Sequence, residues 1–170
     1  MEDPIISGVV TDASEAKVTV LGVPDQPGVS AALFEPLAAA NVNVDMIVQN
    51  TSTAGTTDIS FTVPIADMAV AEGIVADVAG TISATGVSHD NDIAKVSLVG
   101  AGMKTSPGIA AKMFRVLADE GVNIQMISTS TIRISVVMAS ADLERAARVL
   151  HTAFGLDSGQ AYSAPLPERR

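Results

Sequence analysis

The sequence predicts an α+β fold: two copies of one small module, each an antiparallel sheet with helices on one face. Three observations predict it, namely an internal repeat, alternating apolar and polar residues, and apolar residues at helical spacing. The repeat pairs residues 18–47, VTVLGVPDQPGVSAALFEPLAAANVNVDMI, with residues 96–127, VSLVGAGMKTSPGIAAKMFRVLADEGVNIQMI. Its anchors are 80 residues apart: Pro27-Gly28 with Pro107-Gly108, Phe34 with Phe114, and Asn43 with Asn123. Such self-similarity indicates a tandem of one structural unit.

The first copy opens with a strand and a helix. Residues 16–23 are β-branched and apolar, which is typical of a strand, and they end at a turn cluster, Pro24-Asp25-Gln26-Pro27-Gly28. Pro27 suits the first turn of a helix, where its missing N–H is no loss. The helix itself is predicted by the spacing of Val29, Leu33 and Leu37. Asn41-Val42-Asn43 is expected to end it.

The rest of the first copy reads as strand, turn, strand, helix and strand. The two strands are expected at residues 45–50 and 57–63, with a polar turn at residues 51–56 between them. In the second of these strands Ile59, Phe61 and Val63 alternate with polar residues, so they share one face. A short strand at residues 86–89 is expected to close the copy. The helix before it is predicted by an apolar face of Ala71, Ile74, Val75 and Val78.

The second copy repeats this order, with strands predicted at residues 93–99, 124–130 and 132–138. The loop at residues 101–106 is two residues longer than its counterpart. A helix at residues 107–120 is expected to turn inward Ile109, Met113, Val116 and Leu117. Ser140 suits the N-cap of the last helix. That helix is expected to bury Leu143, Ala146, Ala147, Leu150 and Phe154.

Each copy therefore reads β-α-β-β-α plus one more strand, which is the ferredoxin-like plan. The second copy lacks a closing strand unless residues 160–163 supply it, whereas residues 5–10 form a spare strand at the other end. We infer that residues 1–12 join the second sheet. The predicted domains are residues 13–92, inserted, and residues 1–12 together with 93–170. The polar end, residues 157–170, is expected to be mobile or weakly held.

Composition excludes several classes of protein. Of the 170 residues, 48% are hydrophobic and 3% aromatic, so the core must consist of aliphatic residues and Met. The absence of Cys excludes disulfides and thiolate metal sites and fits a reducing cytosol, so a cytoplasmic location is expected. The acidic N-terminus does not read as a signal peptide, and no run of 18 apolar residues could span a membrane. With a net charge of −9 and scattered basic residues, nucleic acid is not an expected partner.

Catalytic and cofactor motifs are weak. His89 lies in an acidic turn without the oxygen spacing of a calcium loop, and His151 lies beside Leu150 in the last helix, so no metal site is expected. Gly100-Ala101-Gly102 lacks the third glycine of a dinucleotide fingerprint. The run Ser128-Thr129-Ser130 has no histidine base in a recognisable motif. The sequence therefore predicts no catalytic residue and no cofactor.

The two Pro-Gly turns are the better candidates for a site. Each comes between a strand and a helix N-terminus, where backbone N–H groups and the helix dipole favour a carboxylate. Asp25 could hold an α-ammonium, and nearby strands offer the amides of Gln49, Asn50, Asn123 and Gln125. Together these groups describe a site for a free amino acid. The alternative is that Pro-Gly merely makes a tight turn and the Asn residues cap helices; the repetition of the pattern favours a ligand.

Several segments resemble the regulatory region of bacterial aspartokinase, and more specifically its separately translated beta subunit, a pair of ACT domains. The segments that carry the resemblance are SEAKVTVLG, DQPGV, NVNVDMIVQN, TTDISFTV, KVSLVGAGMK, PGIAAKMF, GVNIQMISTS and IRISVV. The resemblance covers about residues 5–155, and the start at Met1 matches the start of that subunit. The family's kinase signature is missing from this sequence.

The resemblance implies a regulatory function. Aspartokinase phosphorylates aspartate with ATP, at the head of the pathway to lysine, threonine and methionine. Its beta subunit has no active site and confers feedback inhibition, commonly by threonine and lysine together. The implied partners are these effectors, a second copy through its ACT domains, and the catalytic alpha subunit in a heterotetramer. The alternatives are a free-standing amino-acid sensor that serves a transport or transcription regulator, and an enzyme in its own right.

The resemblance also implies effector-binding residues at contacts between ACT domains. At the first turn they are Asp25, Gly28, Ala31 and Gln49, with Asn123 and Ile124 from the second module. At the second turn they are Met103, Thr105, Ser106, Gly108 and Ile109, facing Val44, Asp45 and Asn50. Three departures from the family bear on the choice of effector: Thr131 replaces a common glutamate, the turn at residues 51–56 is short, and Pro36 should kink the first helix.

Overall fold

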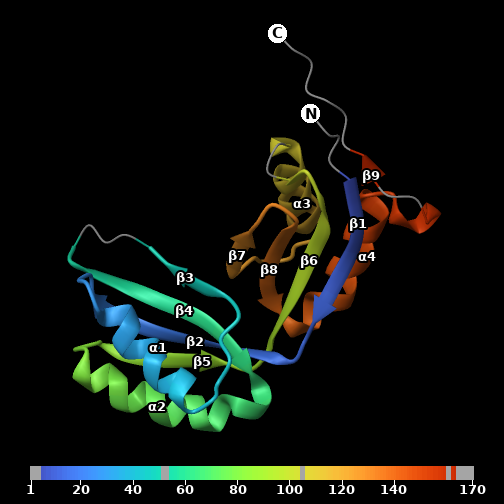
Figure 1. Ribbon diagram of the computed structural model, residues 1–170. Coiled ribbons are helices and arrows are strands. Elements are labelled where there is room, and N and C mark those ends of the chain that lie inside the picture. Colours follow the sequence, from blue (N-terminus) through green and yellow to red (C-terminus); the bar gives the residue numbers. More distant parts are fainter. Residues whose placement is uncertain (1–4, 51–53, 104–105, 160–161, 164–170) are drawn as a thin grey trace. The chain divides into compact units, whose positions relative to one another are not determined.

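The chain forms two compact units in the computed structural model, which describes residues 5–50, 54–103, 106–159 and 162–163 (Figure 1). One unit is Ser14–Ile93, and the other combines Met1–Ala13 with Ala94–Arg170. Each is an antiparallel sheet with two helices, so the fold is the predicted α+β fold of two ferredoxin-like domains. None of the helices in the described ranges is long and apolar enough to cross a membrane.

The inserted unit has a four-stranded sheet in the order β3-β4-β2-β5. Its elements are β2 (Glu15–Pro24), α1 (Val29–Ala39), β3 (Ile47–Gln49), β4 (Thr56–Pro64), a 3-10 turn (Ile65–Asp67), α2 (Met68–Thr81) and β5 (Gly86–Asp90). All pairings are antiparallel, with β2 and β4 at the centre. The edge strand β3 has only three residues, fewer than the strand predicted at residues 45–50.

The other unit has a five-stranded sheet in the order β7-β8-β6-β1-β9. Its elements are β1 (Ile5–Asp12), β6 (Ile93–Ala101), α3 (Pro107–Asp119), β7 (Met126–Thr129), β8 (Arg133–Ala139), 3-10 turns (Ser140–Asp142 and Leu156–Ser158), α4 (Leu143–Ala153) and β9 (Tyr162–Ser163). As predicted, the N-terminal strand β1 joins this sheet, where it lies antiparallel to β6. The short strand β9 then pairs with the outer edge of β1.

Each unit has its own apolar core between its helices and one face of its sheet. In the inserted unit Leu33 and Leu37 of α1 and Ala71 and Val75 of α2 pack with Ile59, Phe61 and Val63 of β4. In the other unit Ile109, Met113 and Leu117 of α3 pack with Ala146 and Leu150 of α4. Burying this aliphatic surface is the main driving force for each fold. The predicted inward faces are confirmed, with Ile74, Val78, Val116, Leu143 and Ala147 partly buried beside the cores.

Two local predictions differ from the structure. Pro27 lies before α1 and not in its first turn, because Gly28 has φ 94° and the helix begins only at Val29. Its counterpart Pro107 does occupy the first turn of α3. Ser140 does not cap α4; it begins a 3-10 turn, and Asp142 takes the N-cap position. Helix α1 runs through Pro36 to Ala39.

The segment directly after α4 packs onto its own unit. Phe154 and Leu156 are buried in the core of this unit, and Gly155 and Gly159 have positive φ. His151 Nδ1 and Asp157 Oδ1 lie 2.7 Å apart, which ties this turn to the end of α4. Leu156–Ser158 therefore form a 3-10 turn that contacts the end of α4. Of residues 160–170, the structure describes only β9.

We predict that Gly100→Ala destabilises the unit of β1 and β6. A Cβ at Gly100 would lie 2.0 Å from the backbone oxygen of Ile5, which β1 cannot avoid without shifting. The expected loss is about 3 kcal/mol of unfolding free energy, measured by urea denaturation. Gly8→Ala is the matched control: its Cβ meets nothing within 4 Å, so a change within about 0.5 kcal/mol is expected. Equal denaturation midpoints for the two variants would contradict the close backbone contact.

We predict that the pKa of Asp157 lies below its ordinary value of 3.8, because the side-chain hydrogen bond from His151, and then that from Thr152, favours the carboxylate. A lowered carboxyl pKa gives stability that is present above 3.8 and is lost as the pH falls through the folded value. Titrating the carboxyl carbon by NMR measures it. His151→Ala should raise the pKa toward 3.8, whereas His89→Ala should leave it unchanged; an identical titration in His151→Ala would rule out the hydrogen bond as the cause.

Candidate functional site

The second Pro-Gly turn joins the end of β6 to the start of α3. Gly102 has φ 72°, which lets the chain leave the strand sharply. Ser106 occupies the N-cap position without a side-chain cap, and its backbone N–H donates to the Met103 oxygen at 3.3 Å. The Ser106 oxygen in turn accepts from Ile109 N–H at 3.2 Å. The first N–H groups of a helix have no acceptor within the helix, so this end of α3 suits an anion.

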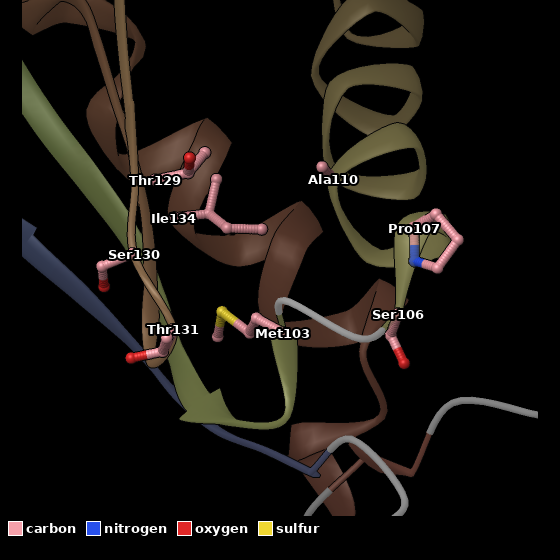
Figure 2. Close-up of a pocket in the computed structure, with 8 residues that line it drawn as sticks. All are labelled: Met103, Ser106, Pro107, Ala110, Thr129, Ser130, Thr131 and Ile134. Atoms are coloured by element: carbon pink, nitrogen blue, oxygen red, sulfur yellow. The ribbon is translucent and has the colours of Figure 1, made fainter. Parts of the chain in front are cut away.

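A cavity of about 470 Å³ opens beside this helix start. One wall is the beginning of α3 with the residues before it, and the other is the β7–β8 hairpin (Figure 2). In the figure, Thr129 and Ile134 lie opposite Pro107 and Ala110, with Met103 between the two walls. The lining residues are Met103, Ser106, Pro107, Ala110, Thr129, Ser130, Thr131 and Ile134.

The lining side chains are all uncharged and combine hydroxyl groups with apolar surface. Ser130 shapes the hairpin: its N–H donates to the Arg133 oxygen at 2.8 Å, and its Oγ accepts from Ile132 N–H at 3.3 Å. The remaining hydroxyls come from Ser106, Thr129 and Thr131. Across the described part of the chain, no cluster of three His, Asp or Glu side chains could hold a metal ion. The cavity thus suits a small neutral or zwitterionic molecule with polar groups to place.

The first Pro-Gly turn has a different geometry. Gly28 sits at the N-cap of α1 in the left-handed region, and its oxygen accepts from Ala32 N–H at 2.9 Å. Asp25 is exposed, and its N–H donates to the Gly55 oxygen at 3.0 Å, which links this turn to the β3–β4 connection. Ser30 Oγ donates to Gln49 Oε1 at 3.3 Å. The start of α1 and strand β3 are therefore joined by side chains.

The two turns differ at one pair of equivalent positions. With the offset of 80 residues, Ser30 corresponds to Ala110 and Gln49 to Thr129. In the inserted unit the longer pair forms a hydrogen bond across the gap between helix and strand. In the other unit Ala110 and Thr129 are shorter, and they line the cavity. The residues at these two positions therefore decide whether the space between helix and edge strand is bridged by a hydrogen bond or left open.

The sequence found part of this cavity. Of the residues predicted at the second turn, Met103 and Ser106 line it, Gly108 and Ile109 lie in the adjoining turn of α3, and Thr105 falls outside the described residues. Thr131, singled out by sequence as a departure, also lines it. The sequence placed Pro107 in the candidate turn but missed Ala110, Thr129, Ser130 and Ile134 as lining residues. The repeat could have indicated Thr129, because its counterpart Gln49 was a candidate.

The remaining predicted residues belong to the first turn and to the two connections that follow the helices. Asp25, Gly28 and Ala31 are exposed at the start of α1. Val44, Asp45 and Asn50 flank β3 in the inserted unit, while Asn123 and Ile124 precede β7 in the other. At each turn, the resemblance therefore combines residues of the inserted unit with residues of the other unit.

Comparison with known proteins identifies the family. An ACT domain profile matches residues 10–88 and 96–154, which is most of the chain. The chain belongs to the ACT domain family. A crystal structure of aspartokinase alpha and beta subunits matches with 47% identity and a TM-score of 0.83, covering 89% of this chain and 99% of that one. The regulatory subunit of aspartate kinase from Thermus thermophilus matches with 38% identity and a TM-score of 0.84, covering 88% and 98%.

Curated relatives agree with this family, and they are longer than this chain. The aspartokinase of Pseudomonas aeruginosa is 52% identical over 158 residues, which is 93% of this chain and 38% of the relative. The aspartokinase of Corynebacterium glutamicum is 49% identical over 158 residues, 92% and 38%. The chain therefore spans 38% of the length of these relatives. It is a regulatory ACT region of the aspartate kinase type, with two ACT domains.

Proposed function

We propose that this chain is the regulatory subunit of an aspartate kinase and binds threonine, with lysine as a second effector, to impose feedback inhibition. The reaction so controlled is the phosphorylation of aspartate by ATP, the first step toward lysine, threonine and methionine. The observation that carries the proposal is the cavity at the second Pro-Gly turn, in a chain whose relatives include aspartate kinase regulatory subunits.

The chemistry of the cavity supports a small amino acid. A carboxylate is favoured at the start of α3, where backbone N–H groups and the helix dipole meet it. The side-chain hydroxyl of a bound amino acid can form hydrogen bonds with Ser106, Thr129 and Thr131. Its methyl group can pack against Met103 and Ile134. A volume of about 470 Å³ accommodates threonine together with bridging water.

The same lining separates the two effectors. Lysine carries a second ammonium group, and burying an ammonium without a carboxylate partner is costly. None of the eight lining side chains is acidic. We therefore assign the cavity to threonine. For lysine the first turn is the better candidate, because Asp25 stands there and offers a negative charge.

Regulation follows from where the effector binds. An amino acid in the cavity contacts both the start of α3 and the β7–β8 hairpin, so it stabilises the arrangement in which these two walls approach. Coupling to a kinase subunit is expected at about 1–3 kcal/mol, and by linkage the kinase state must alter threonine affinity by the same factor.

We expect the partners to be a second copy of the chain and a catalytic alpha subunit, in a heterotetramer. The edge strands β3 and β7 are short and expose Ile47 and Ile127, at 53% and 44% of their surface. Ile47 and Ile127 are equivalent in the repeat. Edge strands with exposed apolar side chains are suited to pairing with another chain. The ACT domains of two copies are therefore expected to associate through these edges.

Filling the cavity tests the threonine assignment. Ala110→Leu adds three carbon atoms to the wall opposite Thr129, and we expect threonine affinity to fall at least about tenfold, or ~1.4 kcal/mol. Isothermal titration calorimetry of the purified chain measures this. Ala111→Leu, on an exposed position of the same helix, is the matched control and should bind as the unchanged chain does. Equal affinities for all three chains would place the threonine site elsewhere.

Removing the carboxylate at the first turn tests the role of Asp25. Because Asp25 is exposed, Asp25→Ala should leave the melting temperature unchanged and weaken amino-acid binding at that turn by about tenfold. In a kinase reconstituted with an aspartokinase alpha subunit, the variant should need more effector for half-inhibition. Calorimetry that shows unchanged affinity would remove Asp25 from the site.

Two results would favour the alternative functions. Failure of the chain to bind any alpha subunit would indicate a free-standing sensor. Turnover of aspartate and ATP by the chain alone would indicate an enzyme.

A further inference from the structure

Strands β1 and β5, which lie beside the central strands β6 and β2, are counterparts in a second repeat register. Residues 7–22, SGVVTDASEAKVTVLG, align with residues 85–100, TGVSHDNDIAKVSLVG, at an offset of 78 residues. Three of the five aligned positions that pair in these strands are identical: Gly8 with Gly86, Val9 with Val87, and Asp12 with Asp90. The repeat therefore includes β1 and β5, the strands that precede β2 and β6 in the sequence.

The pairing registers repeat as well. Strand β1 places Asp12 opposite Lys95 and Val10 opposite Ser97. Strand β5 places Asp90 opposite Lys17 and Ser88 opposite Thr19. All five pairs of β2 with β5 have a counterpart at the offset of 78 in β6 with β1. The equivalence extends to the next strands, where Thr19 bonds Ser60 at 2.8 Å and Ser97 bonds Ser135 at 2.7 Å between hydroxyls.

The closing strands are nevertheless exchanged between the repeats. Strand β1 is followed after two residues by β2, yet it pairs with β6 in the other unit. Strand β5 is followed after two residues by β6, yet it pairs with β2. In each sheet, the central strand β6 or β2 therefore pairs with the strand that directly precedes the other sheet's central strand.

We propose that β1 and β5 are interchangeable: the outer edge of β2 accepts β1, and the outer edge of β6 accepts β5. With Asp12 opposite Lys17, the register of β5, residues 13–16 form a four-residue hairpin loop, a common length. The same holds for residues 91–94 when Asp90 lies opposite Lys95. In both arrangements the paired residues are equivalent in the repeat: an aspartate lies opposite a lysine in each pair of strands. The outer edges of β2 and β6 are therefore each a docking surface for β1 or β5. This inference does not depend on any ligand.

Two features favour the exchanged arrangement. Ile6 is fully buried in the core beside β6, and its counterpart at the offset of 78 is the smaller Ala84. Gly100 lets the backbone of Ile5 and Ile6 approach β6, since a Cβ there would meet the Ile5 oxygen. At the equivalent Gly22 the neighbour is the side chain of Thr85. Ile6 and Gly100 therefore favour the pairing of β1 with β6.

Cysteine trapping in the full chain tests the proposal, and the chain has no cysteine of its own. Val10→Cys with Ser97→Cys links β1 to β6, as in the structure; Val10→Cys with Thr19→Cys links β1 to β2. Directly opposed antiparallel positions satisfy disulfide geometry. After refolding and oxidation, we expect both variants to give an intrachain disulfide and cooperative thermal unfolding. Val10→Cys with Ser135→Cys is the control and should give none, because β8 is not adjacent to β1.

Adding Gly100→Ala sharpens the test, because a Cβ there meets the backbone of Ile5 in β1, whereas the neighbour at the equivalent Gly22 is only a side chain, that of Thr85. The yield of the Thr19→Cys disulfide should rise and that of the Ser97→Cys disulfide should fall. Ser88→Cys with Ser97→Cys should link β5 to β6 in the same way. The proposal is overturned if the Thr19→Cys variant remains reduced or links only between copies, and equally if neither variant links within the chain. Peptide mass mapping under non-reducing conditions distinguishes these outcomes.

Discussion

Gly100 is the point at which three chain segments of one unit meet. Its α-carbon lies against the backbone of Ile5 in β1, where a side chain would not fit. Its N–H donates to the Ile132 oxygen at 2.9 Å, in the turn between β7 and β8. Because the same residue contacts the closing strand and the hairpin, the position of β1 is tied to the position of Thr131 and Ser130. The cavity wall and the sheet edge are thus mechanically connected through one backbone group.

This connection gives an effector a physical route to the rest of the domain. A molecule held between α3 and the β7–β8 hairpin restrains the hairpin, and the hairpin restrains the end of β6 through Gly100. Backbone hydrogen bonds and close backbone contacts deform less than surface side chains do, because packed interiors are stiff. A change at the cavity would therefore be passed to β1 through Gly100, as a regulatory domain requires.

The sequence predicted the fold well because each element has a strong local pattern. Ile59, Phe61 and Val63 alternate cleanly, and Val29, Leu33 and Leu37 keep helical spacing, so neither assignment depended on distant contacts. The repeat supplied the topology that single elements could not. Pro27 and Pro107 show the limit: the same dipeptide precedes both helices, yet the left-handed Gly28 delays only the first. Local sequence does not reveal which neighbouring backbone holds a glycine in that region. The cavity was found only in part for a similar reason, since the pairing of Thr129 with Ile134 is a property of the hairpin register.

The bridge between Ser30 and Gln49 has an evolutionary meaning once it is set beside the open space at Ala110 and Thr129. Duplication leaves a chain with a redundant module, and redundancy frees one copy from the demands placed on the original. Here a single polar contact fastens the helix to the edge strand in one copy, while its twin retains room at that place. Two places that are equivalent in the repeat are therefore no longer alike: a hydrogen bond bridges one, and the other lines a cavity.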